Sequence, residues 1–298
     1  MTRVTILDGG MGHELRRMGA PFSRPLWSAE ALIKAPDDVV KAHLAFIAAG
    51  AEIITVNSYA CVPFHLGEAL YRQRGAELAR LAAALATRAV ALSNTPVQVA
   101  GALPPALGSY RPDLFDADIA RDIGETLFRA QAEHVDLWIA ETISSLAEFD
   151  IQYAILSQSE SPHYYSFTLA DDSESSRLRS GERVTEVAER LCQSNATGLL
   201  FNCSIPEVMG QALQEAKKVI EHQNSALRLG VYANKFTPIK AKHRADTEVL
   251  EMRAIAPDDY LTYAKQWHQL GASIIGGCCG IGPEYIAQLR QWQRQMDE

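Results

Sequence analysis

The chain has few cysteines, no long hydrophobic run and no excess of positive charge. It holds five cysteines in 298 residues, and the apolar run at residues 4–7 is too short for a secretory signal. We therefore expect free thiols in a reducing cytoplasm. No stretch approaches the roughly 20 apolar residues of a membrane span. The formal charge of −8 disfavours a nucleic-acid partner.

The sequence also lacks an internal repeat, a low-complexity tract and an obvious linker, which predicts one domain over residues 1–298. Apolar residues form 47% of the chain, enough for a sizeable core. Short aliphatic runs alternate with amphipathic stretches, and the runs are mostly continuous, as buried parallel strands require. Eight such units predict an α/β fold, the (βα)8 or TIM barrel. The expected strands are residues 4–7, 52–57, 97–101, 137–141, 164–169, 198–202, 229–233 and 273–276.

Seven helices are clear enough to place between these strands. Gly50 and Gly271 each stand before a strand and are expected to end a helix in the left-handed conformation. Insertions at residues 101–116 and 234–255 follow strands, so we expect them at the catalytic end of the barrel, as lids or as solvated loops. The expected helices are residues 36–49, 75–92, 118–134, 184–194, 206–222, 257–270 and 283–296.

Polar or metal-binding residues follow six of the expected strands. The carboxyl ends of barrel strands face one pocket, so these residues are expected to share a site. Asp8 alone fits a turn and Glu141 alone fits a buried ion pair, so the hypothesis depends on their convergence. The groups are Asp8-Gly9-Gly10, Asn57-Ser58-Tyr59, Glu141-Thr142, Asn202-Cys203-Ser204, Tyr232-Ala233-Asn234 and Cys278-Cys279.

Three of these residues are cysteines. Cys203, Cys278 and Cys279 could be ordinary buried packing, but Gly276 and Gly277 surround the pair with little side-chain bulk, which predicts space that a metal fills. Three thiolates from two strand ends indicate Zn²⁺ with one open position. A thiol entering that position would lose its proton, so the site suits sulfur alkylation. No His-x-x-x-His spacing points to a hydrolytic zinc site.

With these motifs the chain resembles the homocysteine S-methyltransferases. The resemblance implies a (βα)8 barrel whose zinc ion is held by Cys203, Cys278 and Cys279. It runs nearly end to end, and the Gly-Gly-Cys-Cys-Gly motif and the Asn-Cys pair are its specific parts. The matching segments are residues 8–15, 25–29, 49–59, 141–142, 202–204 and 276–280.

The resemblance also implies how homocysteine is bound. Asp8 and Glu141 are expected to hold its ammonium group, which two carboxylates can pair with. Backbone amides near Gly9 and Gly10 are expected to seat the amino acid. The remaining candidates for substrate binding are Asn57, Ser58 and Asn202.

Residues 25–29 are similar to the branch of the family that uses S-methylmethionine. The predicted reaction is a direct displacement from a sulfonium donor, S-methylmethionine or S-adenosylmethionine, and it yields methionine. Aromatic side chains could contact the cation. Residues 101–110 and 233–238 depart from the common pattern, so betaine, dimethylsulfoniopropionate or another thiol acceptor stay as alternatives. The donor-site candidates are Trp27, Tyr59, Tyr110, Tyr232 and Asn234.

Two hypotheses other than methyl transfer remain. A non-catalytic zinc barrel would close the fourth position with a protein ligand such as His243, and a redox protein would use Cys278 and Cys279 as a vicinal dithiol. In the leading hypothesis the partners are small molecules only, with no nucleic acid or membrane. The chain is expected to be a monomer or a homodimer.

Overall fold

The computed structural model describes residues 3–171, 176–245 and 248–297. Eight parallel strands follow the order β1-β8-β7-β6-β5-β4-β3-β2, and a parallel bridge between Leu7 and Ile53 joins the first two strands and closes the ring. The predicted (βα)8 barrel is confirmed. The strands are β1 (Thr5–Ile6), β2 (Ile53–Thr55), β3 (Gln98–Leu103), β4 (Leu137–Ile143), β5 (His163–Phe167), β6 (Gly198–Asn202), β7 (Arg228–Tyr232) and β8 (Ala272–Ile275).

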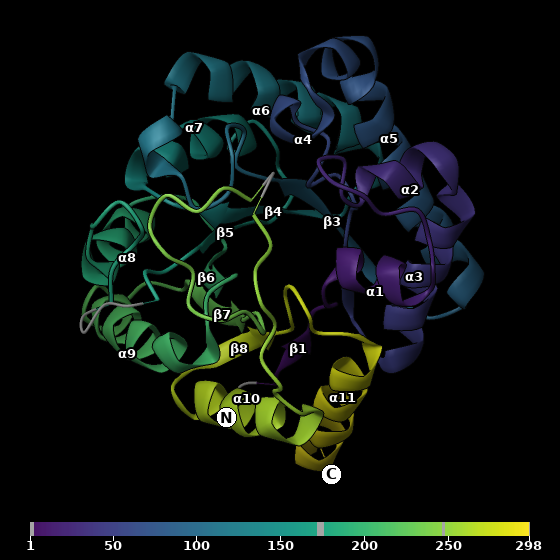
Figure 1. Ribbon diagram of the computed structural model, residues 1–298. Coiled ribbons are helices and arrows are strands. Elements are labelled where there is room, and N and C mark those ends of the chain that lie inside the picture. The colour runs from purple at the N-terminus through teal and green to yellow at the C-terminus, as the bar shows by residue number, and fades with distance from the viewer. Residues whose placement is uncertain (1–2, 172–175, 246–247, 298) are drawn as a thin grey trace.

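Helices surround the strands in an outer ring, seen along the barrel axis in Figure 1. In the described part of the chain no helix is long and apolar enough to cross a membrane. Gly50 (φ 106°) and Gly271 (φ 110°) are left-handed, as predicted. The helices are α1 (Met11–Arg17), α2 (Ala29–Lys34), α3 (Pro36–Ala49), α4 (Pro63–Leu66), α5 (Glu68–Ser93), α6 (Ala117–Gln131), α7 (Leu146–Leu156), α8 (Val184–Cys192), α9 (Pro206–His222), α10 (Pro257–Gln269) and α11 (Pro283–Asp297), with 3₁₀ turns η1 (Pro112–Leu114) and η2 (Ala132–His134).

The strands bury both faces, which explains why their apolar runs are continuous. Side chains such as Leu7, Ile139 and Leu200 pack together inside the ring. Alternate side chains, including Ile54 and Phe201, point outward into the large core under the helices. Period-two alternation therefore separates two apolar environments and not an apolar from a polar one.

The helix between β4 and β5, α7, was not predicted. Its apolar residues occur on every side, so it lacks the amphipathic period by which the other helices were found. Ser145 caps its first turn by accepting a 3.1 Å hydrogen bond from the Glu148 amide. The short helices α1, α2 and α4 were also missed, and α5 begins at Glu68, earlier than the expected residue 75.

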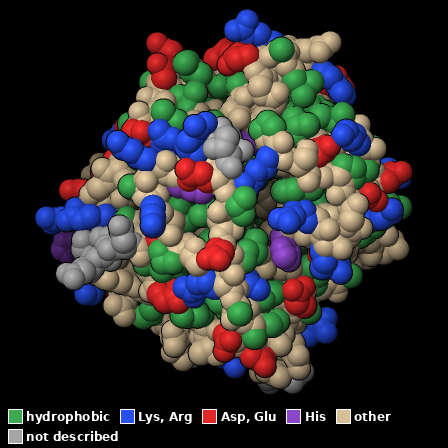
Figure 2. Space-filling view, in the orientation of Figure 1, with side chains coloured by type: hydrophobic (Ala, Val, Ile, Leu, Met, Phe, Trp, Pro, Cys, Tyr) green, Lys and Arg blue, Asp and Glu red, His purple; other side chains and the backbone are tan. Residues whose placement is uncertain are grey.

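The insertion after β7 lies across the carboxyl ends of the strands (Figure 1). An antiparallel bridge pairs Phe236 with Met252, and Phe236, Ile239 and Ala245 are buried. Seen from the same side in Figure 2, charged side chains of both signs lie among hydrophobic ones around this end of the barrel. The described residues of this insertion, 234–245 and 248–255, therefore cover the mouth of the barrel, and a fully solvated loop is the wrong description of those that are buried.

Candidate metal and substrate site

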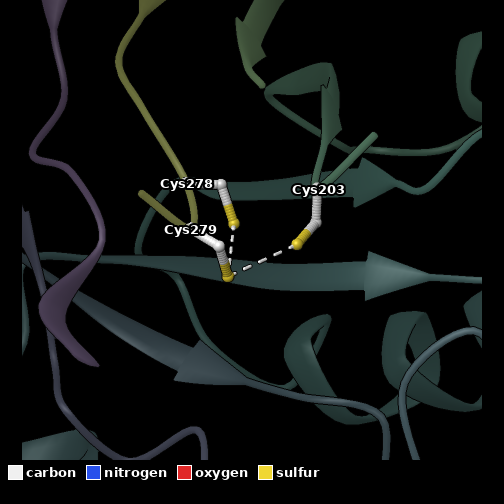
Figure 3. Close-up of side chains that lie close together, drawn as sticks. All are labelled: Cys203, Cys278 and Cys279. Carbon is white, nitrogen blue, oxygen red and sulfur yellow. Dashed lines mark hydrogen bonds between the residues drawn. The ribbon is translucent and has the colours of Figure 1, made fainter. Parts of the chain in front are cut away.

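Three cysteine side chains converge at the carboxyl ends of β6 and β8 (Figure 3). Their Sγ atoms all lie within 4.8 Å of one another. The Sγ of Cys279 is 3.9 Å from those of Cys203 and Cys278. Thiolates on tetrahedral zinc, with 2.3 Å bonds, lie about 3.8 Å apart. The donor type and the spacing therefore fit a zinc ion.

No histidine or carboxylate joins this group among the described residues. His243, the predicted alternative ligand, instead pairs through Nδ1 with Glu248 at 2.9 Å. A site with three protein ligands leaves a coordination position for another group, which is the pattern of catalytic zinc. The arrangement therefore argues against the non-catalytic barrel with His243 as fourth ligand.

Cys203 has the most elaborate surroundings of the three. Its backbone is left-handed, at φ 50°, which is uncommon for a side chain with a Cβ. The Tyr110 hydroxyl lies 2.8 Å from its Sγ and the Asn234 amide nitrogen 4.0 Å. Hydrogen bonds from Cys278 and Cys279 hold the pKa of Cys203 well below its usual value. Cys203 is therefore the thiol whose surroundings most favour the thiolate.

The glycines next to the cysteines have a different purpose from the one predicted. A Cβ on Gly276 would lie 2.4 Å from the Cβ of Leu7, and a Cβ on Gly277 would lie 2.1 Å from Cγ2 of Ile281. The expectation that these glycines leave space for a metal is therefore wrong. Protein atoms already fill the space: Gly276 lets the end of β8 approach Leu7, which follows β1, and Gly277 leaves room for the Ile281 side chain.

Backbone hydrogen bonds hold the cysteine pair in register with its neighbours. The Cys278 amide donates to the Ala233 carbonyl at 2.9 Å, and the Lys235 amide donates to the Cys279 carbonyl at 2.9 Å. On the β1 side, the Gly10 amide donates to the Ile281 carbonyl at 2.8 Å, so it is already used within the protein. The Gly9 amide has no backbone acceptor among the described residues.

Two carboxyl groups lie in the same mouth. Asp8 is buried and accepts hydrogen bonds from the Thr55 amide at 2.7 Å and the Thr55 hydroxyl at 3.2 Å. Burial raises the pKa of Asp8 to about 7. Burial, and then the charge of Asp8, raise the pKa of Glu141 to about 8. No basic side chain in the described ranges acts on either pKa, so the pair is suited to a cation from outside the protein.

The Tyr232 hydroxyl is a buried polar atom near this acidic pair. The charge of Glu141 helps to keep the pKa of Tyr232 above its usual value, after burial itself. Among the described residues no partner lies within normal hydrogen-bond geometry of the hydroxyl, although its interaction with Glu141 acts to lower the pKa of that carboxyl. A buried hydroxyl without a partner is costly unless a ligand supplies one. Tyr232 therefore fits the wall of a ligand site better than simple packing.

Asn202 acts inside the protein wall. Its side-chain oxygen accepts from the Thr142 amide at 3.0 Å and the Ser166 hydroxyl at 2.9 Å, and its nitrogen donates to the Thr142 hydroxyl at 3.0 Å. Thr142 follows Glu141 and is left-handed, at φ 61°. Asn202 thus joins the ends of β4, β5 and β6 and fixes the backbone beside Glu141 and Cys203.

The other two polar candidates have different surroundings. The Asn57 amide donates to the Ser28 carbonyl at 3.3 Å, which ties the end of β2 to the segment that carries Trp27. The Ser58 hydroxyl lies 3.3 Å from the Ala102 carbonyl and 3.2 Å from the side-chain oxygen of Gln131 on α6. Ser58 therefore bonds toward the helix layer and not into the mouth.

The proposed donor aromatics fall into two groups. Tyr110 contacts the Cys203 sulfur, and the hydroxyl of Tyr59 lies 2.6 Å from the Ser109 hydroxyl at the same end of the barrel. Trp27 instead packs on the His65 ring, with centroids 4.9 Å apart. Its indole nitrogen is buried without a partner in the part of the chain that the structure describes. Tyr110 and Tyr59 are therefore placed beside the cysteines more directly than Trp27.

With this geometry in view, comparison with known proteins gives a consistent result. The family model described as homocysteine S-methyltransferase matches residues 5–292. The chain belongs to the homocysteine S-methyltransferase family. The match spans every strand of the barrel and all three cysteines, so the resemblance found in the sequence is confirmed.

Individual members of the family match over nearly their whole length. A selenocysteine methyltransferase from Astragalus bisulcatus is 28% identical, covering 95% of this chain and 90% of the relative. Homocysteine S-methyltransferase 4 from Zea mays is 26% identical, covering 98% and 90%. The metallated form of the homocysteine methyltransferase MmuM from Escherichia coli has a TM-score of 0.79 at 26% identity, covering 97% and 96%.

Sequence reasoning missed a second group of residues at the mouth. Thr168, Asp171 and Arg179 follow β5, and their side chains form hydrogen bonds with one another. The six predicted groups of polar strand-end residues include none from the fifth strand. The rule that strand ends face the site, applied there too, would have found Thr168 and Asp171. Arg179 is eleven residues beyond Thr168, too distant in sequence for that rule.

Proposed function

We propose that the chain binds one zinc ion through Cys203, Cys278 and Cys279 and methylates the sulfur of L-homocysteine to give methionine. The donor we propose is a sulfonium compound, S-methylmethionine or S-adenosylmethionine. The observation that carries the proposal is the convergence of three thiols, all within 4.8 Å of one another, beside two carboxyl groups whose pKa values are raised. Both substrates are small molecules.

Asp8 and Glu141 orient the acceptor in this proposal. Their carboxylates pair with the ammonium of homocysteine, and that positive charge restores the ionisation that burial opposes. The zinc ion, when bound, lowers the pKa of the incoming thiol so that a thiolate is present at neutral pH. The amino-acid end of the acceptor is thus held by charge while its sulfur lies at the cysteines.

The methyl transfer itself requires alignment and a dry site. A carbon–sulfur bond forms to the acceptor thiolate as the bond to the donor sulfur breaks, and the electron pair leaves with the donor as a neutral thioether. Two opposite charges disappear, so excluding water favours the reaction. Phe236 and Ile239 of the segment 234–255 pack against Cys203 and Tyr110 and exclude water there.

Metal analysis tests the zinc site directly. Purified protein should contain about one zinc per chain, and Cys278→Ser should lose the metal and methyl transfer together, because two thiols cannot complete the site. Cys192→Ser is the matched control, since Cys192 lies at the end of α8 outside the metal group. Folded wild-type protein that binds no zinc would refute the proposal. Loss of zinc from the control variant would equally contradict it.

Methionine formation from homocysteine identifies the donor. The protein is incubated separately with S-methylmethionine, S-adenosylmethionine, glycine betaine and dimethylsulfoniopropionate. We expect turnover with a sulfonium amino acid, and turnover only with betaine would contradict that choice. Selenocysteine belongs in the acceptor series because one relative is named for it. A vicinal dithiol would instead show thiol counts that a chelator does not change.

A further inference from the structure

Arg179 is a buried cation that the proposed reaction does not use. Its side chain is 6% exposed and lies on the segment between β5 and α8. It donates to Asp171 Oδ2, to the Thr168 hydroxyl and to the Ile239 carbonyl, each at 3.0 Å. Its guanidinium carbon lies 4.8 Å from the centroid of the Tyr110 ring. All three guanidinium nitrogens therefore donate hydrogen bonds to residues at the mouth of the barrel, and the guanidinium also contacts the Tyr110 ring.

Asp171 and Arg179 both form hydrogen bonds to the backbone of Ile239, a residue of the segment that covers the mouth. The Oδ2 of Asp171 accepts from the Ile239 amide at 2.8 Å, while its Oδ1 accepts from the Ile205 amide at 3.0 Å. Because Arg179 holds the Ile239 carbonyl, both peptide groups of Ile239 are bound by one buried ion pair. A charged pair that satisfies its hydrogen bonds in this way fixes geometry strongly.

Ile239, the residue held by this ion pair, lies over the candidate metal site. Ile239 is 2% exposed and packs in one cluster with Phe236, Tyr110 and Cys203. The Tyr110 ring lies between the Arg179 guanidinium and Cys203, and its hydroxyl is 2.8 Å from the sulfur. Displacing Arg179 would therefore disturb the cover and the Tyr110 hydroxyl at the same time.

We infer that Arg179 is a positioning residue which, with Asp171, anchors residues 234–245 over the three cysteines and directs the Tyr110 hydroxyl at Cys203. Substrates reach the sulfur atoms when Ile239 and Phe236 withdraw, and the ion pair restores the covered state around them. The anchoring stands on contacts alone. Its consequence for the rate rests on the proposed methyl transfer.

The anchor should affect turnover more than acceptor binding. Asp8, just after β1, and Glu141, in β4, form the proposed ammonium site, and within the described ranges neither has a hydrogen bond to Arg179. Without the anchor, the aligned and dehydrated arrangement forms less often, so kcat falls while KM for homocysteine changes little. A residue with a purely structural role would lower the amount of folded enzyme without this split.

The test compares three variants with one control. Arg179→Lys keeps the charge but loses the planar fork, and Arg179→Met removes the charge. Because Arg179→Met leaves Asp171 unpaired, the double variant Arg179→Met with Asp171→Asn removes both charges and protects the fold. Arg190→Met is the control, since Arg190 pairs with Asp150 on the exposed outer helices.

Two readouts are measured on the full-length protein, with zinc supplied for the kinetic one. Trypsin cleavage after the exposed Lys240 and Lys242 reports opening of the covering segment, and steady-state methionine formation gives kcat and KM. Loss of charge-assisted hydrogen bonds should speed the cleavage and lower kcat by about ten- to a hundredfold in all three variants. The control should keep wild-type values.

The possible results separate this inference from the proposed function. Wild-type cleavage rates in folded Arg179→Lys and in the folded double variant would overturn the anchor. Faster cleavage with an unchanged kcat would overturn the positioning role. If wild-type protein binds no zinc and methylates no acceptor, the proposed function fails, and trypsin still decides the anchor by itself.

Discussion

Acidic side chains at the two ends of the barrel have their pKa values shifted in opposite directions. At the amino-terminal end, Glu52 accepts from the Ile6 amide at 2.9 Å, bonds to Gln293 and pairs with Arg3 and Arg290. Burial alone would raise its pKa, but these partners outweigh burial and lower it. At the carboxyl-terminal end, the pKa values of Asp8 and Glu141 are raised to about 7 and about 8.

This difference in pKa shift indicates that Glu52 contributes to stability, whereas Asp8 and Glu141 are suited to binding a ligand. Glu52 finds its cations inside the chain, so that end of the barrel is complete without a ligand. Asp8 and Glu141 find none among the described residues, and the Tyr232 hydroxyl beside them also lacks a partner. The raised pKa values mean that ionising these groups costs free energy in the substrate-free protein, and under the proposed function the ammonium group of the acceptor offsets this cost.

The largest expected effect, on the KM for homocysteine, comes from removing the charge of Glu141. Glu141→Gln removes one of the two carboxylates that we propose pair with the homocysteine ammonium, and breaking such an ion pair costs about 2–5 kcal/mol. We expect KM for homocysteine to rise by one to three orders of magnitude. Steady-state kinetics at saturating donor measure this. An unchanged KM would remove Glu141 from the acceptor site, and zinc content serves as the control for folding.

The pH dependence of stability should carry the opposite sign from that of a paired acid. The unfolded chain ionises Asp8 and Glu141 near pH 4, whereas the folded protein keeps their protons until about pH 7 and 8. The folded state thus binds more protons in this window, so substrate-free stability falls as pH rises from about 4 to about 8 and then levels. The fall is on the order of 4 kcal/mol for each of the two groups.

Denaturant unfolding across this pH range measures the effect. Glu148 also has a pKa raised to about 7 by burial, so Glu148→Gln determines its share of the slope. Glu141→Gln should remove the contribution of Glu141 and leave that of Asp8. Stability that instead rises through the window would show that both mouth carboxyls are paired in solution.

A smaller effect, on stability only, is expected at the other end. Glu52→Gln leaves Arg3 and Arg290 without their carboxylate and should lower the free energy of unfolding by about 1–3 kcal/mol. The kinetic constants of the folded enzyme should stay at wild-type values, because this network lies across the barrel from the cysteines. A selective loss of turnover in Glu52→Gln would break the contrast between the two ends.

The smallest effect tests a residue that the sequence placed at the mouth. Ser58→Ala removes hydrogen bonds to Ala102 and Gln131 and should cost about 1 kcal/mol of stability. The affinity for homocysteine should not change, since the hydroxyl bonds toward α6. A tenfold rise in KM with unchanged stability would return Ser58 to the substrate site.

Much of the fold could be predicted because each strand is a continuous apolar run and most helices are amphipathic. That signal fails for α7, which is apolar on every side, and it cannot report contacts between distant residues. Gly276 and Gly277 were noticed in the sequence, but the reason for them, close approach to Leu7 and Ile281, depends on how β1 packs against β8. Arg179 was overlooked because its partner Ile239 is sixty residues away.

The amino-acid sequence by itself determined the barrel, the strand ends that meet at its mouth and, through the cysteine motifs, the family to which the chain belongs. Local periodicity and short motifs encode these features, and both are written along the chain. Tertiary structure alone decided the 3.9 Å spacing of the sulfur atoms, the raised pKa values of Asp8 and Glu141 and the grip of Asp171 and Arg179 on Ile239. Distances, burial and charge partners arise only when segments far apart in sequence are packed together, because each depends on atoms that the other segments supply.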